Sequence, residues 1–191
     1  NPATDLGGRS ALTWSGSEYL VAWFEHFVTD PLRTMRVDPE GTPLGSVVPI
    51  VSSDEGSYRP SLTWTGSEYF IGWNNRTARI GTDGEQTGGI ASNGCEDGPT
   101  SLAWTGSEFG MACWRSIGAF DGAATFQRLT PAGVPIGSDL QIDDSLGLGS
   151  KTASVWNGNG FGYTWIGRGA SGYDELWRSV EDAALPRDFG L

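Results

Sequence analysis

The sequence predicts an all-β protein in which one four-stranded antiparallel unit occurs four times. A twelve-residue pattern that begins at Leu12 recurs from Leu62, Leu102 and Ser154. Each copy joins two short runs of aromatic and β-branched residues through a Gly-containing turn, which is typical of a β-hairpin. The composition agrees, because 29 Gly, 10 Pro and 9 Trp describe a turn-dense chain whose apolar mass lies in aromatic side chains.

Two further strands are expected after each hairpin. In the first repeat they flank the Pro- and Gly-containing turn at 38–41, and such a turn joins neighbouring antiparallel strands. In chain order, the expected third and fourth strands are 34–37 with 45–50, 77–80 with a strand ending near 90, 126–129 with 134–136 and 140–142, and 176–180 with 185–191. The repeats are thus expected at about 10–51, 60–91, 100–142 and 152–191 of a single domain, 1–191.

One arginine falls in each expected third strand, at Arg36, Arg79, Arg128 and Arg178. The next hairpin Trp follows after 28, 25 and 28 residues, while 13 residues follow Arg178 and 13 precede Trp14. The two chain ends therefore stand in the same phase of the repeat. Tandem four-stranded meanders of about 40 to 50 residues are the signature of a β-propeller. We expect a four-bladed β-propeller closed by one chain, each blade being an antiparallel meander; a larger ring, completed by a second copy or by further chain, is the less favoured alternative.

The repeated pattern is Trp-x-Gly-x-x-Tyr/Phe, an apolar strand ending in Trp, Arg-x-x-x-x-Gly, and a Pro-containing fourth strand. It covers essentially the whole chain and resembles the propeller-type repeats of large secreted bacterial proteins. The blade number resembles that of hemopexin-like four-bladed propellers, which is a comparison of architecture alone. We therefore expect a secreted or cell-surface protein. The start at Asn1-Pro2 is expected of a processed or excised chain.

Eight of the nine tryptophans stand at or beside equivalent strand positions. This recurrence favours packing between blades over a sugar-stacking surface, since buried aromatics supply most of the apolar area of small blades. The structural set comprises the hairpin residues Trp14, Trp64, Trp104 and Trp156, with Trp23, Trp73 and Trp165 at the ends of second strands. Trp114 is one residue out of phase. We expect Trp114 and Trp177 to be exposed, as candidate ligand-binding residues.

The repeated arginines are also expected to be structural. A guanidinium group can tie one third strand to the neighbouring blade through a carboxylate, and Glu18, Glu68 and Glu108 in the hairpin turns are suitable partners. Gly160 replaces the fourth glutamate although Arg178 remains. Convergence of the arginines on an anion is the functional alternative.

The two cysteines leave two alternatives open. Cys113 occupies the position of the repeated second-strand Trp, so its side chain is expected in the packed interior. Cys95 lies in the polar segment that leads into the same repeat. A single disulfide in an oxidising compartment and two buried thiols both fit this placement.

Carboxylates gather in the segments that lead into the repeats. The candidate ligand-binding residues among them are Asp54, Glu96, Asp97, Asp143 and Asp144. Because they share one phase of the repeat, we expect them near one face, where they could hold Ca²⁺ or act as a pair of catalytic carboxylates. No Asp-x-Asp-x-Asp-Gly loop supports calcium, and no other cofactor is evident.

The net charge of −11 without any basic cluster argues against nucleic acid, and no apolar run is long enough to cross a membrane. The single histidine, His26, excludes a multi-histidine metal site. We expect it at the surface, as a further candidate ligand-binding residue. Regular repeats without a unique nucleophile and base favour a non-catalytic binding module for a glycan, small molecule or protein. The alternatives are a carbohydrate hydrolase or lyase that uses the lead-in carboxylates, and a structural repeat or assembly subunit that self-associates.

Overall fold

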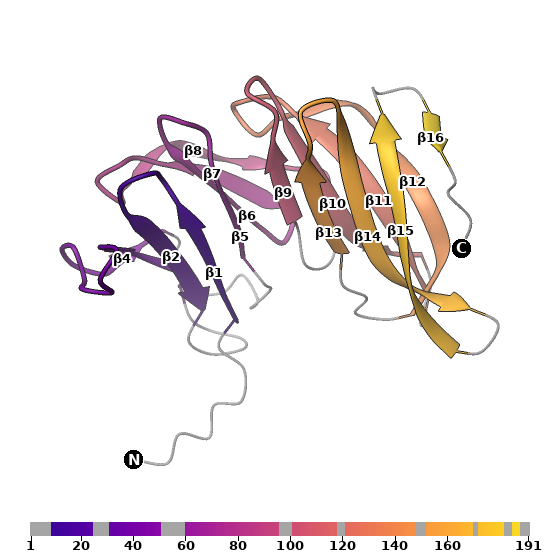
Figure 1. Ribbon diagram of the computed structural model, residues 1–191, viewed down its shortest axis with the longest axis horizontal. Helices are drawn as coiled ribbons and strands as arrows, with labels where there is room; N and C mark the ends of the chain where they lie inside the picture. The colour runs from indigo at the N-terminus through magenta and orange to yellow at the C-terminus, as the bar shows by residue number, and fades with distance from the viewer. Residues whose placement is uncertain are drawn as a thin grey trace, which may run out of the picture.

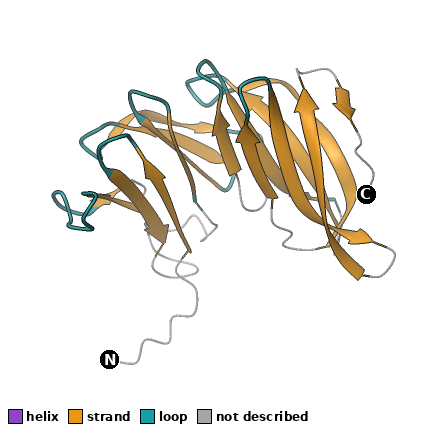
Figure 2. Cartoon of the chain, viewed as in Figure 1, coloured by secondary structure: helices purple, strands orange, loops and turns teal. Residues whose placement is uncertain are grey.

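The computed structural model describes residues 9–24, 31–50, 60–95, 101–117, 121–147, 152–169, 172–181 and 185–187. Within these ranges every regular element is a β-strand and there is no helix (Figure 2). The strands form four antiparallel sheets of four strands each, one for each predicted repeat. The all-β prediction and the four meanders are therefore confirmed.

Each sheet keeps its strands in chain order. Sheet 1 consists of β1 (Arg9–Trp14), β2 (Tyr19–Phe24), β3 (Arg33–Val37) and β4 (Val48–Pro49). Sheet 2 consists of β5 (Ser61–Trp64), β6 (Tyr69–Trp73), β7 (Arg76–Ile80) and β8 (Gln86–Ser92). Sheet 3 consists of β9 (Ser101–Trp104), β10 (Phe109–Ser116), β11 (Asp121–Leu129) and β12 (Pro135–Gly147), and sheet 4 of β13 (Thr152–Trp156), β14 (Gly160–Gly169), β15 (Gly172–Glu181) and β16 (Leu185–Arg187).

The turn between the first two strands explains why its glycine recurs. In sheet 1 the Ser15 amide donates to the carbonyl of Glu18 (2.9 Å), and the Glu18 amide donates back to Ser15 Oγ (3.1 Å). Gly16 lies between them with φ of 105°, a conformation that disfavours any Cβ. The equivalent glycines of the other sheets, Gly66, Gly106 and Gly158, have φ of 102°, 106° and 96°. The predicted hairpins are thus confirmed in all four repeats.

Consecutive sheets pack face to face in a row (Figure 1). We call the face of a sheet that contacts the preceding sheet its leading face, and the opposite one its trailing face. In sheet 1 the leading face is the one turned away from sheet 2. On the trailing face of sheet 1, Leu20, Ala22 and Phe24 pack against Tyr69 and Trp73 on the leading face of sheet 2. Because side chains alternate along a strand, the other side of β6 faces sheet 3.

The same arrangement recurs at the next two junctions. Phe70 of sheet 2 stacks on Phe109 of sheet 3 with ring centroids 3.8 Å apart. Phe126 of sheet 3 packs against Phe161 of sheet 4 with centroids 5.0 Å apart. One hydrophobic cluster therefore fills each of the three junctions, and the core of the protein lies between sheets and not within them.

The row of sheets is open. Sheets 1 and 4 lie at its opposite ends (Figure 1), so the expected ring closed by one chain is absent from the described part of the chain. Matching phase at the two ends does not by itself close a ring. Side-chain packing at the junctions decides how far each sheet is rotated relative to the next. The spacing of the repeats along the sequence carries no information about that rotation.

Trp114 corrects one prediction. Its side chain is only 7% exposed, in the cluster between sheets 3 and 4, so the expectation of an exposed indole is wrong. The reason is that β10 continues past Cys113, which places Trp114 at the position of buried Phe24 in sheet 1. Trp177 lies in β15, where its backbone pairs with Thr164; its side chain lies outside the described residues.

The hairpin tryptophans mostly have the predicted structural role. Trp64, Trp104 and Trp156 pack against the three junction clusters. Each also contacts the aromatic residue across its hairpin, as the Trp64 and Tyr69 rings do at 4.6 Å. Trp14 makes the same contact with Tyr19 at 4.6 Å but remains 42% exposed.

Candidate functional site

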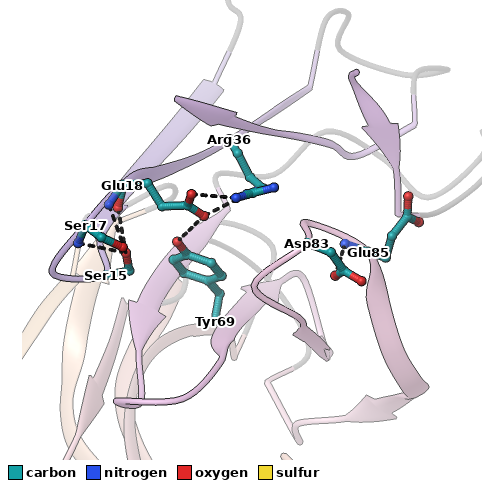
Figure 3. Close-up of polar contacts among 7 residues, drawn as sticks. All are labelled: Ser15, Ser17, Glu18, Arg36, Tyr69, Asp83 and Glu85. Carbon is teal, nitrogen blue, oxygen red and sulfur yellow. Dashed lines mark hydrogen bonds and ion pairs between the residues drawn. The ribbon is translucent and has the colours of Figure 1, made fainter. Parts of the chain in front are cut away.

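The repeated arginines pair with the repeated glutamates, as the sequence predicted. Arg36 donates from Nε and Nη2 to the two carboxylate oxygens of Glu18, at 2.7 Å each (Figure 3). Arg128 forms the same bidentate pair with Glu108, at 2.8 and 2.6 Å. Each pair, however, joins the third strand to the hairpin turn of its own sheet. The glutamate partner therefore lies in the same sheet, and the expectation of a carboxylate from the neighbouring blade is wrong for these two pairs.

Arg79 of sheet 2 also stays within its sheet, since its Nε donates to Glu68 at 2.8 Å. The side chain of Arg178 lies outside the described residues, so its role stays a prediction. Because the three described guanidinium groups are each held by a separate carboxylate, they do not converge on a common anion.

Tyr69 of sheet 2 contacts Glu18 across the first junction. Its hydroxyl donates to Oε1 of Glu18 at 3.2 Å, and its ring is fully buried (Figure 3). Phe109 and Phe161 replace this tyrosine in sheets 3 and 4, so among the described junctions only the first has this hydrogen bond from a tyrosine to the hairpin glutamate. The Arg36 hydrogen bond is the main cause that lowers the pKa of Glu18, which therefore remains ionised at neutral pH.

A groove of about 260 Å³ lies beside Arg36, between sheets 1 and 2. Sheet 1 supplies the wall from β3, β4 and their connection, and sheet 2 supplies the turn between β7 and β8. The lining consists of Thr34, Met35, Arg36, Leu44, Gly45, Ser46, Val48, Asp83, Gly84 and Glu85. The groove is therefore mostly polar, with a guanidinium group on one side and two carboxylates on the other.

The turn of sheet 2 is fixed against sheet 1 at the floor of the groove. Thr34 Oγ1 donates to the carbonyl of Gly84 at 3.2 Å. Gly84 has φ of 86°, and a Cβ there would lie 3.3 Å from the Arg36 side chain. Thr77 makes the equivalent bond to Gly133 at the next junction, at 3.4 Å. The turn glycines thus permit close contact between neighbouring sheets.

The carboxylates of the groove differ in how they are held. Asp83 accepts the Glu85 amide on Oδ1 at 3.0 Å, which fixes the turn (Figure 3). Both side chains are exposed at the rim. The hydrogen bond to Glu18 raises the pKa of Arg36 above its ordinary value, so the guanidinium group is charged at neutral pH. No histidine or cysteine is among the described residues that line the groove, which offers hydrogen-bonding groups and charge.

Of the predicted ligand-binding residues, only Trp114 has a described side chain, and it does not line this groove. Asp54, Glu96, Asp97 and His26 fall outside the described residues. Asp143 and Asp144 lie in β12, where the backbone of Asp143 pairs with Ala124; their side chains are not described. Proximity of the lead-in carboxylates therefore stays a prediction. Among the described residues, no three His, Cys, Asp or Glu side chains are grouped to hold a metal ion.

Cys95 and Cys113 are both free and buried. Cys113 lies in the cluster between sheets 2 and 3, which confirms that it points where the equivalent Trp residues point. The Cys95 thiol is directed at the carbonyl of Trp114, 3.9 Å away. Burial, together with the neighbouring Cys95 thiol, raises the pKa of Cys113 well above its ordinary value, so it is a poor nucleophile.

Sequence reasoning missed Thr34, Asp83 and Glu85. A signal was present, because Thr34 and Thr77 both stand two residues before a repeated arginine. The strands at 77–80 and ending near 90 imply a turn between them, but the position of this turn against β3 of the preceding sheet follows only from packing.

No protein-family model and no characterised protein matches this sequence significantly. Within the described residues, no helix is long and apolar enough to cross a bilayer. The function must therefore be inferred from the geometry of the chain itself.

Proposed function

We propose that this chain is a secreted or surface-exposed, non-catalytic binding module whose sheets are consecutive blades of a β-propeller-type array. The observation that carries the proposal is the polar groove between sheets 1 and 2. It combines the held guanidinium of Arg36 with the exposed carboxylates of Asp83 and Glu85.

The size and lining of the groove suggest its ligand. Its volume of about 260 Å³ lies just below the range of roughly 300–1,000 Å³ for sites of drug-sized ligands. Carboxylates accept hydrogen bonds and guanidinium groups donate them, so adjacent hydroxyl groups suit this lining. Met35 and Val48 offer apolar surface beside them. We infer a small polyhydroxylated ligand, such as one unit of a glycan.

A titration of the protein with a panel of monosaccharides and short oligosaccharides, followed by NMR shift perturbation, tests this function. We expect the shifts to centre on residues 34–36 and 83–85. Glu85→Gln and Asp83→Asn should each weaken binding, since both keep the size of the side chain and remove its charge. Asn retains the oxygen that accepts the Glu85 amide, so the turn should persist.

Glu40→Gln is the matched control, because Glu40 is also an exposed carboxylate of a turn but does not line the groove. It should leave affinity unchanged. Absence of binding across the panel, or equal affinities of the groove variants and the control, would overturn the proposal. Turnover of a glycoside that is abolished by Asp→Asn at a lead-in carboxylate would instead favour the hydrolase alternative.

A further inference from the structure

We propose that the leading face of sheet 1 docks on the trailing face of sheet 4 of a second copy of this chain. Two copies joined head to tail at both ends would then close one ring of eight sheets. This proposal concerns the ends of the row and does not depend on the ligand groove.

The second strands show that the leading face of sheet 1 lacks a partner sheet. In sheet 2, Tyr69, Ile71 and Trp73 are each 0% exposed beneath sheet 1. The equivalent residues of sheet 4, Phe161, Tyr163 and Trp165, are at most 6% exposed. In sheet 1 the same three positions hold Tyr19, Val21 and Trp23, and all three are only partly buried. The side chains are of the same apolar kind, so the difference is the missing neighbour.

The first strand shows the same difference in exposure, and the difference is larger. Leu12 and Trp14 on β1 are 60% and 42% exposed. Leu102, the equivalent of Leu12 in sheet 3, is 7% exposed because it packs against sheet 2. Large apolar side chains gathered on one face mark an interaction surface. Leu12, Trp14, Tyr19, Val21 and Trp23 form one such face.

The other half of the interface lies on the trailing face of sheet 4. Val155 is 62% exposed there, and Ala153 on the same side of β13 is exposed too. The residue equivalent to Val155 in sheet 3 is Ala103, which is 6% exposed because sheet 4 covers it. One chain therefore carries both complementary halves of the junction that it uses three times internally.

Two internal junctions define the register expected between copies. Ser61 Oγ accepts the Leu102 amide at 3.1 Å, and Ser101 Oγ accepts the Ser154 amide at 2.9 Å. In both cases the serine stands three residues before the hairpin Trp of its own sheet. The amide that it accepts stands two residues before the hairpin Trp of the next sheet. The same register places Ala153 of one copy beside Leu12 of the other.

A second copy is the occupant that these observations favour. The two unpaired faces lie at opposite ends of one row (Figure 1), so the described strands of one chain do not cover them. A head-to-tail contact that closes after two copies gives two identical interfaces and leaves no face exposed. The three junctions between consecutive sheets of one chain show how such a contact packs.

Mass in solution, measured by light scattering on the size-exclusion eluate, tests the proposal. The wild-type chain should have twice the mass of a single chain. Leu12→Lys and Ala153→Glu should each give monomers, since either change puts an unpaired charge into both interfaces of the ring. Circular dichroism should show an unchanged sheet content in both variants, because both sites are exposed in a single copy.

Mixing the two variants in equal amounts should restore dimers. In the mixed ring, one interface is wild type and the other places the introduced lysine opposite the introduced glutamate. Val134→Lys and Ala132→Glu are matched controls, since both residues are exposed in the turn after β11, and both variants should remain dimeric. A monomeric wild-type chain would overturn the proposal. So would dimers of Ala153→Glu alone, which indicate a face-to-face contact of two copies of sheet 1, or a mixture that stays monomeric.

Discussion

The hydroxyl of Tyr69 donates a hydrogen bond to Glu18 across the junction of sheets 1 and 2, at 3.2 Å. Glu18 simultaneously binds Arg36 of its own sheet. One carboxylate thus links an ion pair within sheet 1 to the buried core of sheet 2, next to the wall of the polar groove between these sheets.

Removal of the Tyr69 hydroxyl should weaken this junction. Tyr69→Phe deletes a hydrogen bond to a charged group, so we expect a loss of about 1.5 to 3 kcal/mol in the free energy of unfolding. Urea denaturation followed by Trp fluorescence measures the loss. Tyr19→Phe is the control at the equivalent position of sheet 1, where the hydroxyl has no hydrogen bond to another described residue, and its effect should stay within about 0.5 kcal/mol. Equal losses in the two variants would contradict the assigned role of Tyr69.

The Glu18 pair should make stability depend on pH in the acidic range. The pKa of Glu18 in the folded protein is lowered from its ordinary value of 4.5, mainly by the hydrogen bond from Arg36. A lowered pKa means that the folded state binds the proton more weakly than the unfolded state does. The stabilisation is therefore complete above pH 4.5 and is lost as the pH falls through the lowered value.

Comparison with Glu18→Gln isolates this contribution. Gln cannot ionise, so the variant should be less stable than the wild type near neutral pH and should approach it as the pH falls below 4.5. Urea denaturation over a pH series supplies the measurement. A difference between the two proteins that does not change with pH would show that the ionised carboxylate is not the source of the stability.

Gly110 should not tolerate a side chain. It lies on the trailing face of sheet 3, and a Cβ there would overlap the ring of Phe161 in sheet 4. We expect Gly110→Ala to lower the free energy of unfolding by about 1 to 3 kcal/mol, as overpacked core sites do. Gly89→Ala is the control, since a Cβ at that position would meet nothing within 4 Å and its φ is not positive. Thermal unfolding should separate the two variants; a stable Gly110→Ala protein would contradict the packing of sheets 3 and 4.

The two cysteines should react with a thiol reagent only after unfolding. Both are buried and free, and the pKa of Cys113 is raised well above its ordinary value. The thiolate is the reactive form, so the folded protein should cause no change in absorbance with Ellman's reagent. Unfolded, unreduced protein should titrate as two thiols. A count of zero thiols would show that Cys95 and Cys113 form a disulfide.

Much of the fold follows from local sequence. The glycine of the hairpin turn must be glycine because φ is near 100° in every copy. The alternation of side chains then fixes which residues share a face, which is why the sequence alone places Cys113 on the same buried face of its sheet as Trp73 and Trp165 on theirs. The pairing of Arg36 with Glu18 was also foreseeable, because both residues recur in a fixed relation to the hairpin.

Only the tertiary structure decided how these faces are used. Trp114 is buried because β10 extends further than its pattern indicated and sheet 4 covers it. The groove exists because the Asp83 turn of sheet 2 packs on Thr34 of sheet 1. Leu12 and Leu102 have the same local sequence context, yet they are 60% and 7% exposed. The physical reason is that a residue's neighbours along the chain determine its strand and its face, whereas its burial depends on a sheet from another repeat that either covers it or does not.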